Sequence, residues 1–305
     1  MKVAVVGAYG AGLTMRTPRM PSAGETLSGG VFTSGHGGKG SNQAVAARRL
    51  GAEVSLLTIV GNDGFGRSAR QLWSEEDVDV SCVRTSDSPT MAGFIIVEED
   101  GENRIIIAPG ALQDLTESDV TAFERELACA DVVVVSLEIP LGVAFAALRV
   151  AHDAGTLTVV NPAPAAVIPD FVWDSIDVIT PNETEIGVIL GALEAEGSPS
   201  ELATQLHAMA RSDVVLTRGS RGAVTATSGG LSIIPPIVAS RVVDTTGAGD
   251  AFTAALAVAL ADGCSVSEAA RFASYAGAFS VAHMEVIASL AYRSDLPDYH
   301  PSHAD

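Results

Sequence analysis

Short runs of β-branched residues alternate along the chain with longer Ala-rich segments. The runs predict strands, and their continuous apolar character is typical of strands buried on both faces. The predicted strands are Val3–Gly7, Val54–Val60, Val132–Ser136, Leu157–Val160, Val178–Thr180 and Val214–Thr217. The predicted helices are Ser41–Leu50, Gly66–Glu75, Ser118–Cys129, Leu141–Asp153, Glu183–Leu190, Ser200–Arg211, Asp250–Ala261 and Ser265–His283. This alternation predicts an α/β fold in which a mostly parallel central sheet is covered on both faces.

Two stretches break the alternation. Glu25–Gly35 and Met91–Ala108 have β-rich or alternating patterns and no helix beside them, and the second turns at residues 100–103. We expect them to form a small β-sheet lid over the site, inserted at about residues 14–36 and 89–108 of one domain spanning 1–292. Exposed strands leave edges and apolar surface that a second subunit can cover, so a homodimer through this lid is expected.

Composition restricts the class of protein. The 305 residues are 47% hydrophobic and 18% charged, which is typical of a globular chain with a substantial core. A formal net charge of −19 argues against nucleic acid and anionic membranes as partners, because both attract Lys and Arg. Three widely spaced cysteines fit a reducing, cytoplasmic compartment better than a disulfide framework or a zinc site. The polar tail at residues 293–305, which contains two prolines, is expected to be poorly ordered.

The segment Asp244–Asp250 carries the strongest functional signal. It reads Asp-Thr-Thr-Gly-Ala-Gly-Asp and leads directly into an apolar helix. Small residues let the backbone approach a ligand, and N–H groups at a helix N-terminus attract anions. Asp250 lies beside this anion site, where its carboxylate can take a proton from an acceptor hydroxyl. Phosphoryl transfer is therefore expected, although a tight turn capped by Asp250 has the same pattern.

A second Gly-rich segment precedes the helix predicted to begin at Ser41. Gly38 permits close approach of a ligand, while Lys39, Asn42 and Gln43 supply hydrogen-bond donors. Lys39 is not followed by Ser or Thr, so this segment is not a Walker A loop. The donors suit a polyhydroxylated ligand; the alternative is a solvated loop that caps the helix.

A third segment, Thr180–Glu185, directly follows a predicted strand. Asn182 and Glu185 put an amide and a carboxylate in the first turn of the next helix, a pattern that suits Mg²⁺ held through water. The same residues are typical of an ordinary helix cap, and a cap is the more common case. Weaker candidates lie at the ends of other strands: Glu138, Asn161–Pro164 and Thr217–Gly222.

In combination these segments resemble the PfkB or ribokinase family of carbohydrate kinases. The matching segments are Gly37–Ala44, Asn161–Pro164, Pro181–Glu185 and Asp244–Phe252, in that order. The resemblance extends from Val3 to about Val281. It implies a ribokinase-like three-layer α/β sandwich with a β-lid. It also implies ATP and Mg²⁺ as cofactors, and K⁺ as an activating ion.

The resemblance also implies roles for individual residues. Asp250 would be the base, and the amides of Gly247, Ala248 and Gly249 would form an anion hole for the transferring phosphoryl group. The residues implied to hold the sugar are Gly38, Lys39, Asn42 and Glu138. The residues implied to serve the nucleotide are Asn182, Thr217 and Gly219, with Glu185 contacting Mg²⁺ through water, and Asp244 and Thr246 helping to bind the monovalent cation.

Two departures from the family pattern bear on the ligands. Gly10 and Gly12 stand where ribokinases carry an Asn and an Asp that grip sugar hydroxyls. Loss of the carboxylate removes charge-assisted hydrogen bonds to sugar hydroxyls, worth roughly 1.5–3 kcal/mol each, which makes ribose itself a poor candidate, and the two glycines leave room for a bulkier substrate. Residues 285–291 also depart from the family's Gly-Ala-x-x-Ser-x-Pro segment, and this weakens the case for the cation site and part of the adenine pocket.

The expected activity is transfer of the γ-phosphoryl group of ATP to a primary hydroxyl of a sugar, either ribose-like or a related sugar or polyol. A nucleoside kinase of the same superfamily is the alternative. A catalytically inactive nucleotide- or sugar-binding regulatory protein is a more remote one, because Asp250 and the Gly-Ala-Gly hole are intact.

Overall fold

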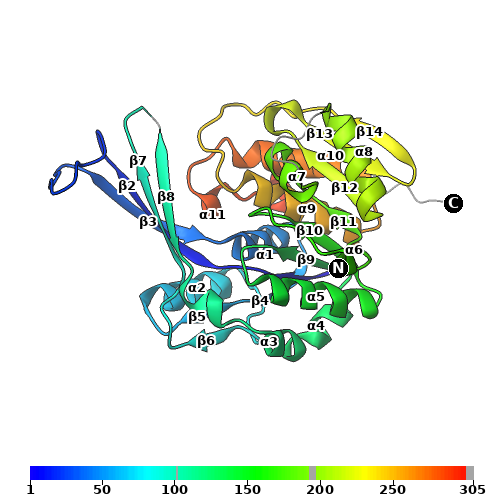
Figure 1. Ribbon diagram of the computed structural model, residues 1–305, viewed down its shortest axis with the longest axis horizontal. Helices are drawn as coiled ribbons and strands as arrows, with labels where there is room; N and C mark the ends of the chain where they lie inside the picture. The colour runs from blue at the N-terminus through cyan, green and yellow to red at the C-terminus, as the bar shows by residue number, and fades with distance from the viewer. Residues whose placement is uncertain (101, 192–196, 300–305) are drawn as a thin grey trace.

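A computed structural model describes residues 1–100, 102–191 and 197–299. Within these residues the main body contains an eight-stranded sheet of order β14-β13-β12-β11-β10-β9-β1-β4 (Figure 1). Its strands are β1 Lys2–Val6, β4 Glu53–Leu57, β9 Val132–Ser136, β10 Leu157–Asn161, β11 Val178–Ile179, β12 Asp213–Thr217, β13 Ala223–Thr227 and β14 Gly230–Ile234. All pairs from β4 to β12 are parallel, whereas the β12–β13 and β13–β14 pairs are antiparallel. The predicted, mostly parallel sheet is confirmed.

Helices cover both faces of this sheet. On one face lie α1 Lys39–Arg49, α2 Gly64–Glu75, α9 Ala248–Ala261 and α10 Val266–Ser280. On the other lie α3 Glu117–Ala122, α4 Glu124–Cys129, α5 Leu141–Asp153, α6 Asp170–Trp173, α7 Glu183–Ile189 and α8 Pro199–Ala210. Alternate side chains of β1 enter the two cores, Val3 and Val5 on one face and Ala4 and Val6 on the other. The fold is therefore the expected three-layer α/β sandwich.

Some elements differ from the prediction. The helix predicted over residues 118–129 is divided at Phe123, whose ψ of 3° interrupts it between α3 and α4. The strand predicted over 54–60 is two strands, β4 and β5 Ile59–Gly61, and β5 pairs with β6 Arg84–Ser86. The antiparallel hairpin of β13 and β14 was not predicted, because its threonines and glycine interrupt the apolar run that marks a buried strand.

The lid is a separate four-stranded sheet of order β3-β2-β7-β8, which projects from the main body at the left of Figure 1. Its strands are β2 Gly10–Arg16, β3 Val31–Gly37, β7 Ala92–Val97 and β8 Asn103–Ala108. A small separate sheet is confirmed, but two of its boundaries differ from the prediction.

The first lid strand begins at Gly10, although the inserted segment was expected to start near residue 14. The strand predicted from Glu25 begins only at Val31, because Gly24 and Gly29 adopt left-handed conformations that a strand does not contain. Gly101, in the predicted turn between the other two strands, lies outside the described residues.

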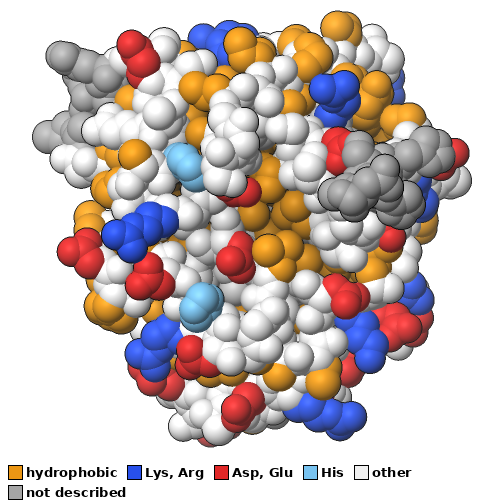
Figure 2. Space-filling model, turned by 90° about the vertical axis from the view of Figure 1, so that its right-hand side faces the viewer, with side chains coloured by type: hydrophobic (Ala, Val, Ile, Leu, Met, Phe, Trp, Pro, Cys, Tyr) orange, Lys and Arg blue, Asp and Glu red, His pale blue; other side chains and the backbone are white. Residues whose placement is uncertain are grey.

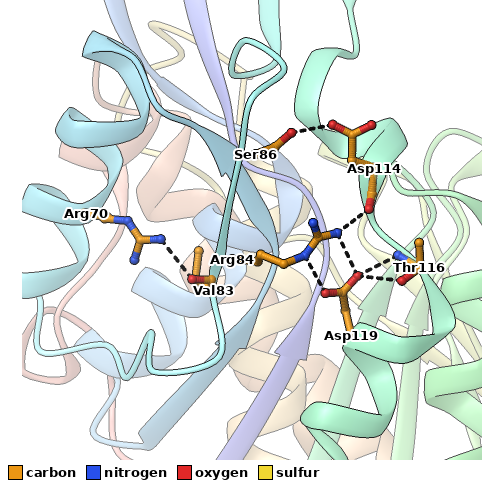
Figure 3. Close-up of polar contacts among 7 residues, drawn as sticks. All are labelled: Arg70, Val83, Arg84, Ser86, Asp114, Thr116 and Asp119. Carbon is orange, nitrogen blue, oxygen red and sulfur yellow. Dashed lines mark hydrogen bonds and ion pairs between the residues drawn. The ribbon is translucent and has the colours of Figure 1, made fainter.

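Polar contacts anchor the base of the β7–β8 hairpin (Figure 3). Ser86, before β7, donates a hydrogen bond to the Asp114 carboxylate, which lies at the end of the 3-10 turn η1 Gly110–Asp114 after β8. Arg84 donates to the Asp114 carbonyl and, over 2.8 Å, to the Asp119 carboxylate. Asp119 is itself held by the backbone and hydroxyl of Thr116. The two chain ends of the lid hairpin are thus tied together on the main body.

Residues 293–299 pack against α10. The rings of Tyr299 and Phe272 lie 4.4 Å apart, and the Arg293 guanidinium lies over both. Residues 300–305 of the predicted tail lie outside the described residues, and the domain boundary at residue 292 stays a prediction.

Figure 2 views the end of the molecule away from the lid. Acidic and basic side chains are interspersed with apolar ones on that face. Among the described residues, no helix is both long enough and apolar enough to cross a membrane.

Candidate active site

A cavity of about 190 Å³ lies where the carboxyl ends of the central strands meet the N-terminus of α9. Its lining includes most of the predicted catalytic and nucleotide residues, namely Asp250, Gly247, Gly249, Asn182 and Thr217. The other lining residues are Lys39, Asn161, Ala163, Thr180, Glu185 and Thr253. Parallel α/β sheets bind ligands at this edge. A larger hollow of about 570 Å³ lies at the opposite, amino ends of β1 and β4, but it contains none of the predicted site residues and mixes charges of both signs.

Asp250 is buried in the first turn of α9. Its Oδ2 accepts a hydrogen bond from Asn42 Nδ2 over 2.7 Å, and its Oδ1 accepts one from Gln43 Nε2 over 3.2 Å. Burial raises the pKa of Asp250 to about 6; the nearby Glu138 carboxylate acts in the same direction, while Lys39 and the two amides act against it. The pKa of this carboxylate therefore lies close to neutral pH, so the group can both take up and release a proton there.

Lys39 and Glu138 form a partly buried pair beside Asp250. Lys39 Nζ lies 3.2 Å from Glu138 Oε1, and the Lys39 backbone N–H donates to Glu138 Oε2 over 2.8 Å. Burial disfavours the Lys39 cation, but the carboxylates of Glu138 and Asp250 outweigh it and raise the pKa of Lys39. The wall of the cavity thus carries a fixed positive charge between two carboxylates.

Gly38 lets the helix α1 begin close to the segment that follows β1. Its φ of +88° is a conformation that favours glycine, and a Cβ there would lie 2.5 Å from the Cα of Tyr9 and 2.6 Å from the carbonyl oxygen of Ala8. Any other residue would push α1 outward, and Lys39 and Asn42 would move with it.

The predicted anion hole is the uncapped N-terminus of α9. Gly247 precedes the helix with φ +82°, and none of the side chains that the structure describes caps the first turn. A Cβ at Gly247 would lie 2.7 Å from Val286 Cγ1, whereas no atom of the described residues outside the local backbone lies within 4 Å of one at Gly249. Backbone N–H groups with open space beside them, at the positive end of a helix, are a ready site for a phosphoryl group.

Asn182 and Glu185 form a reciprocal cap at α7. The Asn182 side chain accepts from the backbone of Glu185 over 2.8 Å, and Glu185 Oε2 accepts from the backbone of Asn182 over 2.8 Å. Burial raises the pKa of Glu185, although the hydrogen bond from Asn182 opposes this. The cap expected as an alternative is present, and both residues also line the cavity together with Thr217. Gly219 begins the next 3-10 turn, η2 Gly219–Arg221, beyond the cavity lining.

Asp244 and Thr246 lie in the loop before α9 and outside the cavity lining. Asp244 Oδ1 accepts from the backbone of Thr246 over 2.9 Å. Residues 285–291, which depart from the family's sequence pattern, lie nearby and contain the short helix α11 Val286–Ser289. Val286 contacts Gly247. Glu285 has φ +64°, a backbone conformation that non-glycine residues seldom adopt. The departure seen in the sequence thus changes the local backbone and puts an apolar side chain against the loop.

Gly10 and Gly12, the two glycines that depart from the family's sequence pattern, lie in the lid. A Cβ at Gly10 would come within 3.1 Å of the Met91 side chain. Gly12 is in register with Gly35 and Gly93 on its two neighbouring strands. This row across three strands is bare backbone, which offers neither a carboxylate nor an amide side chain.

Sequence reasoning gave no role to Thr180, the first residue of the third segment, and missed Thr253; their hydroxyls lie 3.3 Å apart in the cavity. Thr253 follows Asp250 by three residues, so both lie on one face of α9. That spacing was the available signal, but the apolar character of the helix concealed it. Asn42 and Glu138 do not line the cavity themselves; they contact it through Asp250 and Lys39.

The pfkB family of carbohydrate kinases matches residues 2–292. The chain belongs to this family. It is 35% identical to a ribokinase from Haemophilus influenzae over 297 residues, which cover 97% of each protein. It is 36% identical to a ribokinase from Lactococcus lactis subsp. lactis over 281 residues, or 92% of this chain and 90% of the relative.

Solved structures agree with this assignment. A ribokinase from Arabidopsis thaliana complexed with ribose and ATP matches with a TM-score of 0.88, at 30% identity over 96% of each chain. A Burkholderia thailandensis nucleoside kinase in complex with inosine matches with a TM-score of 0.78 over 96% of this chain and 94% of that one. At 20% identity the second match shows the shared fold alone. The family resemblance is confirmed, and the protein is a carbohydrate kinase, a phosphotransferase with a hydroxyl group as acceptor.

Proposed function

We propose that the protein transfers the γ-phosphoryl group of ATP to a primary hydroxyl of a sugar or related polyol, with Asp250 as the base. The observation that carries this proposal is the buried Asp250 carboxylate, with a pKa of about 6, beside the uncapped N-terminus of α9. A general base works best when its pKa lies near the working pH. A phosphoryl group at the helix terminus would lie next to that base.

Charge and position account for the transfer step. Asp250 takes the proton of the acceptor hydroxyl as its oxygen bonds to the γ-phosphorus, and the bond from that phosphorus to the bridging oxygen breaks to release ADP. The amides of Gly247, Ala248 and Gly249 face the negative charge of the transferring group. Asn182, Thr217 and Gly219 contact the nucleotide in this proposal.

Four residues hold the acceptor. Gly38 sets the backbone, Lys39 donates, Glu138 accepts, and Asn42 offers its side-chain oxygen. Asn42 Oδ1 is buried and has no hydrogen-bond partner among the described residues, which supports a hydroxyl of the substrate as its donor.

Mg²⁺ fits the cavity near Glu185, whose cap occupies only Oε2 and leaves the second carboxylate oxygen for a water-mediated contact. Among the described residues no three or more His, Cys, Asp or Glu side chains cluster in a way that could hold a metal. Phosphate oxygens and water would therefore supply most of its ligands. When bound, Mg²⁺ neutralises phosphate charge.

Asp244 and Thr246 remain the residues proposed for K⁺. The Asp244 carboxylate supplies an oxygen ligand, but Val286 places methyl groups against the same loop. We expect weaker dependence on K⁺ than a loop surrounded by oxygen ligands would give.

We propose a ribose-like or related sugar or polyol as the acceptor; ribose itself is less favoured, because Gly10 and Gly12 offer no side chain to its hydroxyls. The bare row of Gly12, Gly35 and Gly93 leaves space for a larger group. A nucleoside is the second candidate, and the same space favours it.

A homodimer through the lid and a cytoplasmic location complete the proposal. Large apolar side chains of the lid are exposed: Val31, Phe32, Phe94, Ile105, Ile106 and Ile107. Burying such a surface in a second subunit is favourable. The described cysteines, Cys82, Cys129 and Cys264, are free, which fits a reducing compartment.

The test is ADP release with ATP and Mg²⁺ across pentoses, hexoses, sugar alcohols and nucleosides. We expect turnover with one of these classes and a loss of at least about 1000-fold in Asp250→Asn, since the base is gone. Asp170→Asn, the same change at an exposed helix start away from the cavity, is the matched control. A rate in Asp250→Asn equal to that of the control would contradict the proposed base.

A further inference from the structure

Gln43 is a fully buried polar residue that touches the proposed base. It is the fifth residue of α1 and has 0% exposure. Its Nε2 donates to Asp250 Oδ1 over 3.2 Å and to Asn161 Oδ1 over 3.3 Å. A single side-chain amide thus joins the start of α9 to the carboxyl end of β10.

Asn42 and Gln43 divide the two oxygens of Asp250 between them. Asn42 donates to Oδ2 and Gln43 to Oδ1. Successive residues of a helix point about 100° apart, so one turn of α1 presents two separate donors to the same carboxylate. Two donors on different oxygens stop the carboxylate from rotating about its last side-chain bond.

The presence of Gln43 is not explained by core packing. Its Oε1 is buried and has no hydrogen-bond partner among the described residues. An unsatisfied buried acceptor costs about 1–3 kcal/mol, whereas an apolar side chain of similar volume would fill the space without that cost. The structure therefore accepts an energetic penalty to keep an amide against Asp250.

We propose that Gln43 is the positioning residue of the catalytic base: its amide ties the Asp250 carboxylate to Asn161 on β10 and fixes the direction in which that carboxylate meets the acceptor hydroxyl. Gln43 has no exposed surface, whereas Asn42, which is proposed to hold the acceptor, is 4% exposed; Gln43 therefore acts through Asp250 and does not touch the substrate. This inference rests on the proposed role of Asp250.

The charges around Asp250 determine what loss of Gln43 would do. Burial and the Glu138 carboxylate raise the pKa of Asp250, while the Lys39 cation, Asn42 and Gln43 lower it. Removing the Gln43 donor leaves the raising effects less opposed, so the pKa of Asp250 rises further. A base with a higher pKa is protonated, and inactive, over a wider range of acidic pH.

The test is the pH dependence of kcat/KM in Gln43→Met, which removes the donors and keeps the side-chain length. Wild-type kcat/KM is expected to fall as the pH drops through about 6, where Asp250 takes up a proton. In Gln43→Met this acidic limb should move up by about one pH unit, and kcat at pH 7 should fall about 10- to 100-fold. The KM for the acceptor should change by less than about twofold, because Gln43 makes no contact with it.

Gln43→Glu is the second variant, for use also where Gln43→Met does not fold. It keeps the shape of the side chain but places a carboxyl group beside Asp250, so the limb should move further than in Gln43→Met. Thr156→Val is the matched control: the Thr156 hydroxyl is buried and bonded to the Leu127 carbonyl over 2.9 Å, away from the cavity. It should leave the limb unchanged.

The outcomes separate the inference from the proposed function. An acidic limb that stays in place in both Gln43 variants, with a loss that is equal at all pH values, means a structural role and overturns the inference. If Asp250→Asn itself keeps full activity, the proposed base is wrong, and the role proposed for Gln43 is then wrong as well. A limb that moves in Gln43→Met and further in Gln43→Glu, but not in Thr156→Val, supports the inference.

Discussion

The main sheet and the lid sheet of this kinase are stabilised in different ways. Every residue of β9 in the main sheet is buried, whereas every residue of β8 in the lid is exposed. Both strands are rich in β-branched apolar residues, so composition does not distinguish them. The difference lies in what covers them, since helices pack on both faces of the main sheet and the lid projects away from the body (Figure 1).

This contrast shows where the folding free energy of the protein originates. Burial of apolar surface contributes roughly 25 cal/mol per Å², and the main sheet gains this term within one chain. The exposed isoleucines of β8 do not gain it in a single subunit. Their apolar character is therefore better explained by contact with a second subunit or a ligand than by the stability of the monomer.

The largest expected effect is a difference in stability loss between two substitutions of aromatic residues, one in the main body and one in the lid. Trp73 has 0% exposure, packs edge-on against Tyr9 and donates to Ser41 Oγ over 2.9 Å, whereas Phe94 in the lid is 54% exposed. Trp73→Ala should lower the free energy of unfolding by about 3–5 kcal/mol, and Phe94→Ala by less than about 0.5 kcal/mol in a monomer. Urea denaturation of both variants measures this. Equal losses would mean that the lid folds as part of the main core.

The second prediction concerns association and uses two matched isoleucines. Ile106 in the lid is 70% exposed and Ile233 on the edge strand β14 is 69% exposed. If the lid is the dimer surface, Ile106→Lys should weaken dimerisation by about 100-fold, since it places a charge in an apolar interface. Ile233→Lys should leave it unchanged. Sedimentation at micromolar concentration tests both, and a monomeric wild-type protein would rule out this use of the lid.

The third prediction concerns the charge of Asp250, which is buried in the candidate active site of the main body. The pKa of Asp250 is about 6 in the folded chain against an ordinary value of 3.8, so the folded state binds its proton more readily. The stability that this proton contributes is present below about pH 4 and is lost as the pH rises through about 6. Asp250→Asn cannot ionise, and should be more stable than wild type by up to about 3 kcal/mol at pH 8.

Buried acceptors near Asp250 add to this expectation. Asn42 Oδ1 and Gln43 Oε1 lack partners among the described residues, and the new amide can donate to one of them. Thermal unfolding of both proteins at pH 8 and near pH 4 measures the difference, which should shrink toward the acidic end. A variant less stable than wild type at pH 8 would show that ionised Asp250 is not a cost to the fold.

The main body could be predicted from the sequence, because its strands are uninterrupted apolar runs between Ala-rich helices. The strand at Val132–Ser136 and the helix at Leu141–Asp153 have the predicted bounds. Burial on both faces selects apolar residues at every strand position, so the pattern is read directly.

The lid was predicted as a small separate sheet, but its strand β2 was not predicted, for a physical reason. β2 reads Gly-Ala-Gly-Leu-Thr-Met-Arg, and its glycines have low strand propensity. It is a strand because it pairs along its length with β3 on one side and β7 on the other. Tertiary pairing outweighed local preference here, and a local pattern does not contain that information.

Individual residues of the site could be predicted from the sequence, but the contacts between them could not. The Gly-rich segments identified Asp250, Gly247 and Lys39, and all three line the cavity. The hydrogen bond from Gln43 to Asp250 joins residues 207 positions apart, and it exists only because α1 and α9 pack together. Spacing along the chain could not show which amide holds the base.

The smallest expected effect tests how the lid is attached to the body. Arg84 bridges the two chain ends of the lid hairpin through Asp119 and the Asp114 carbonyl, and its side chain is 44% exposed. Exposed ion pairs contribute little, so Arg84→Ala should lower global stability by only about 0.5 kcal/mol. Its local effect should be larger, because the contact closes the base of one hairpin. Amide hydrogen exchange in β7 and β8 should become faster by about twofold or more, while exchange in β9 should not change.

The control is Arg48→Ala, which removes an ion pair with Asp77 on the main body. Its side chain is 32% exposed, so the global cost should be similar, but lid exchange should stay as in wild type. If both variants leave lid exchange unchanged, the attachment depends instead on Thr90, whose backbone N–H and hydroxyl bond the Asp63 carboxylate over 2.7 and 2.8 Å. These two contacts involve a buried residue, Thr90, and would then have to hold the hairpin while its apolar strands stay free to meet a partner.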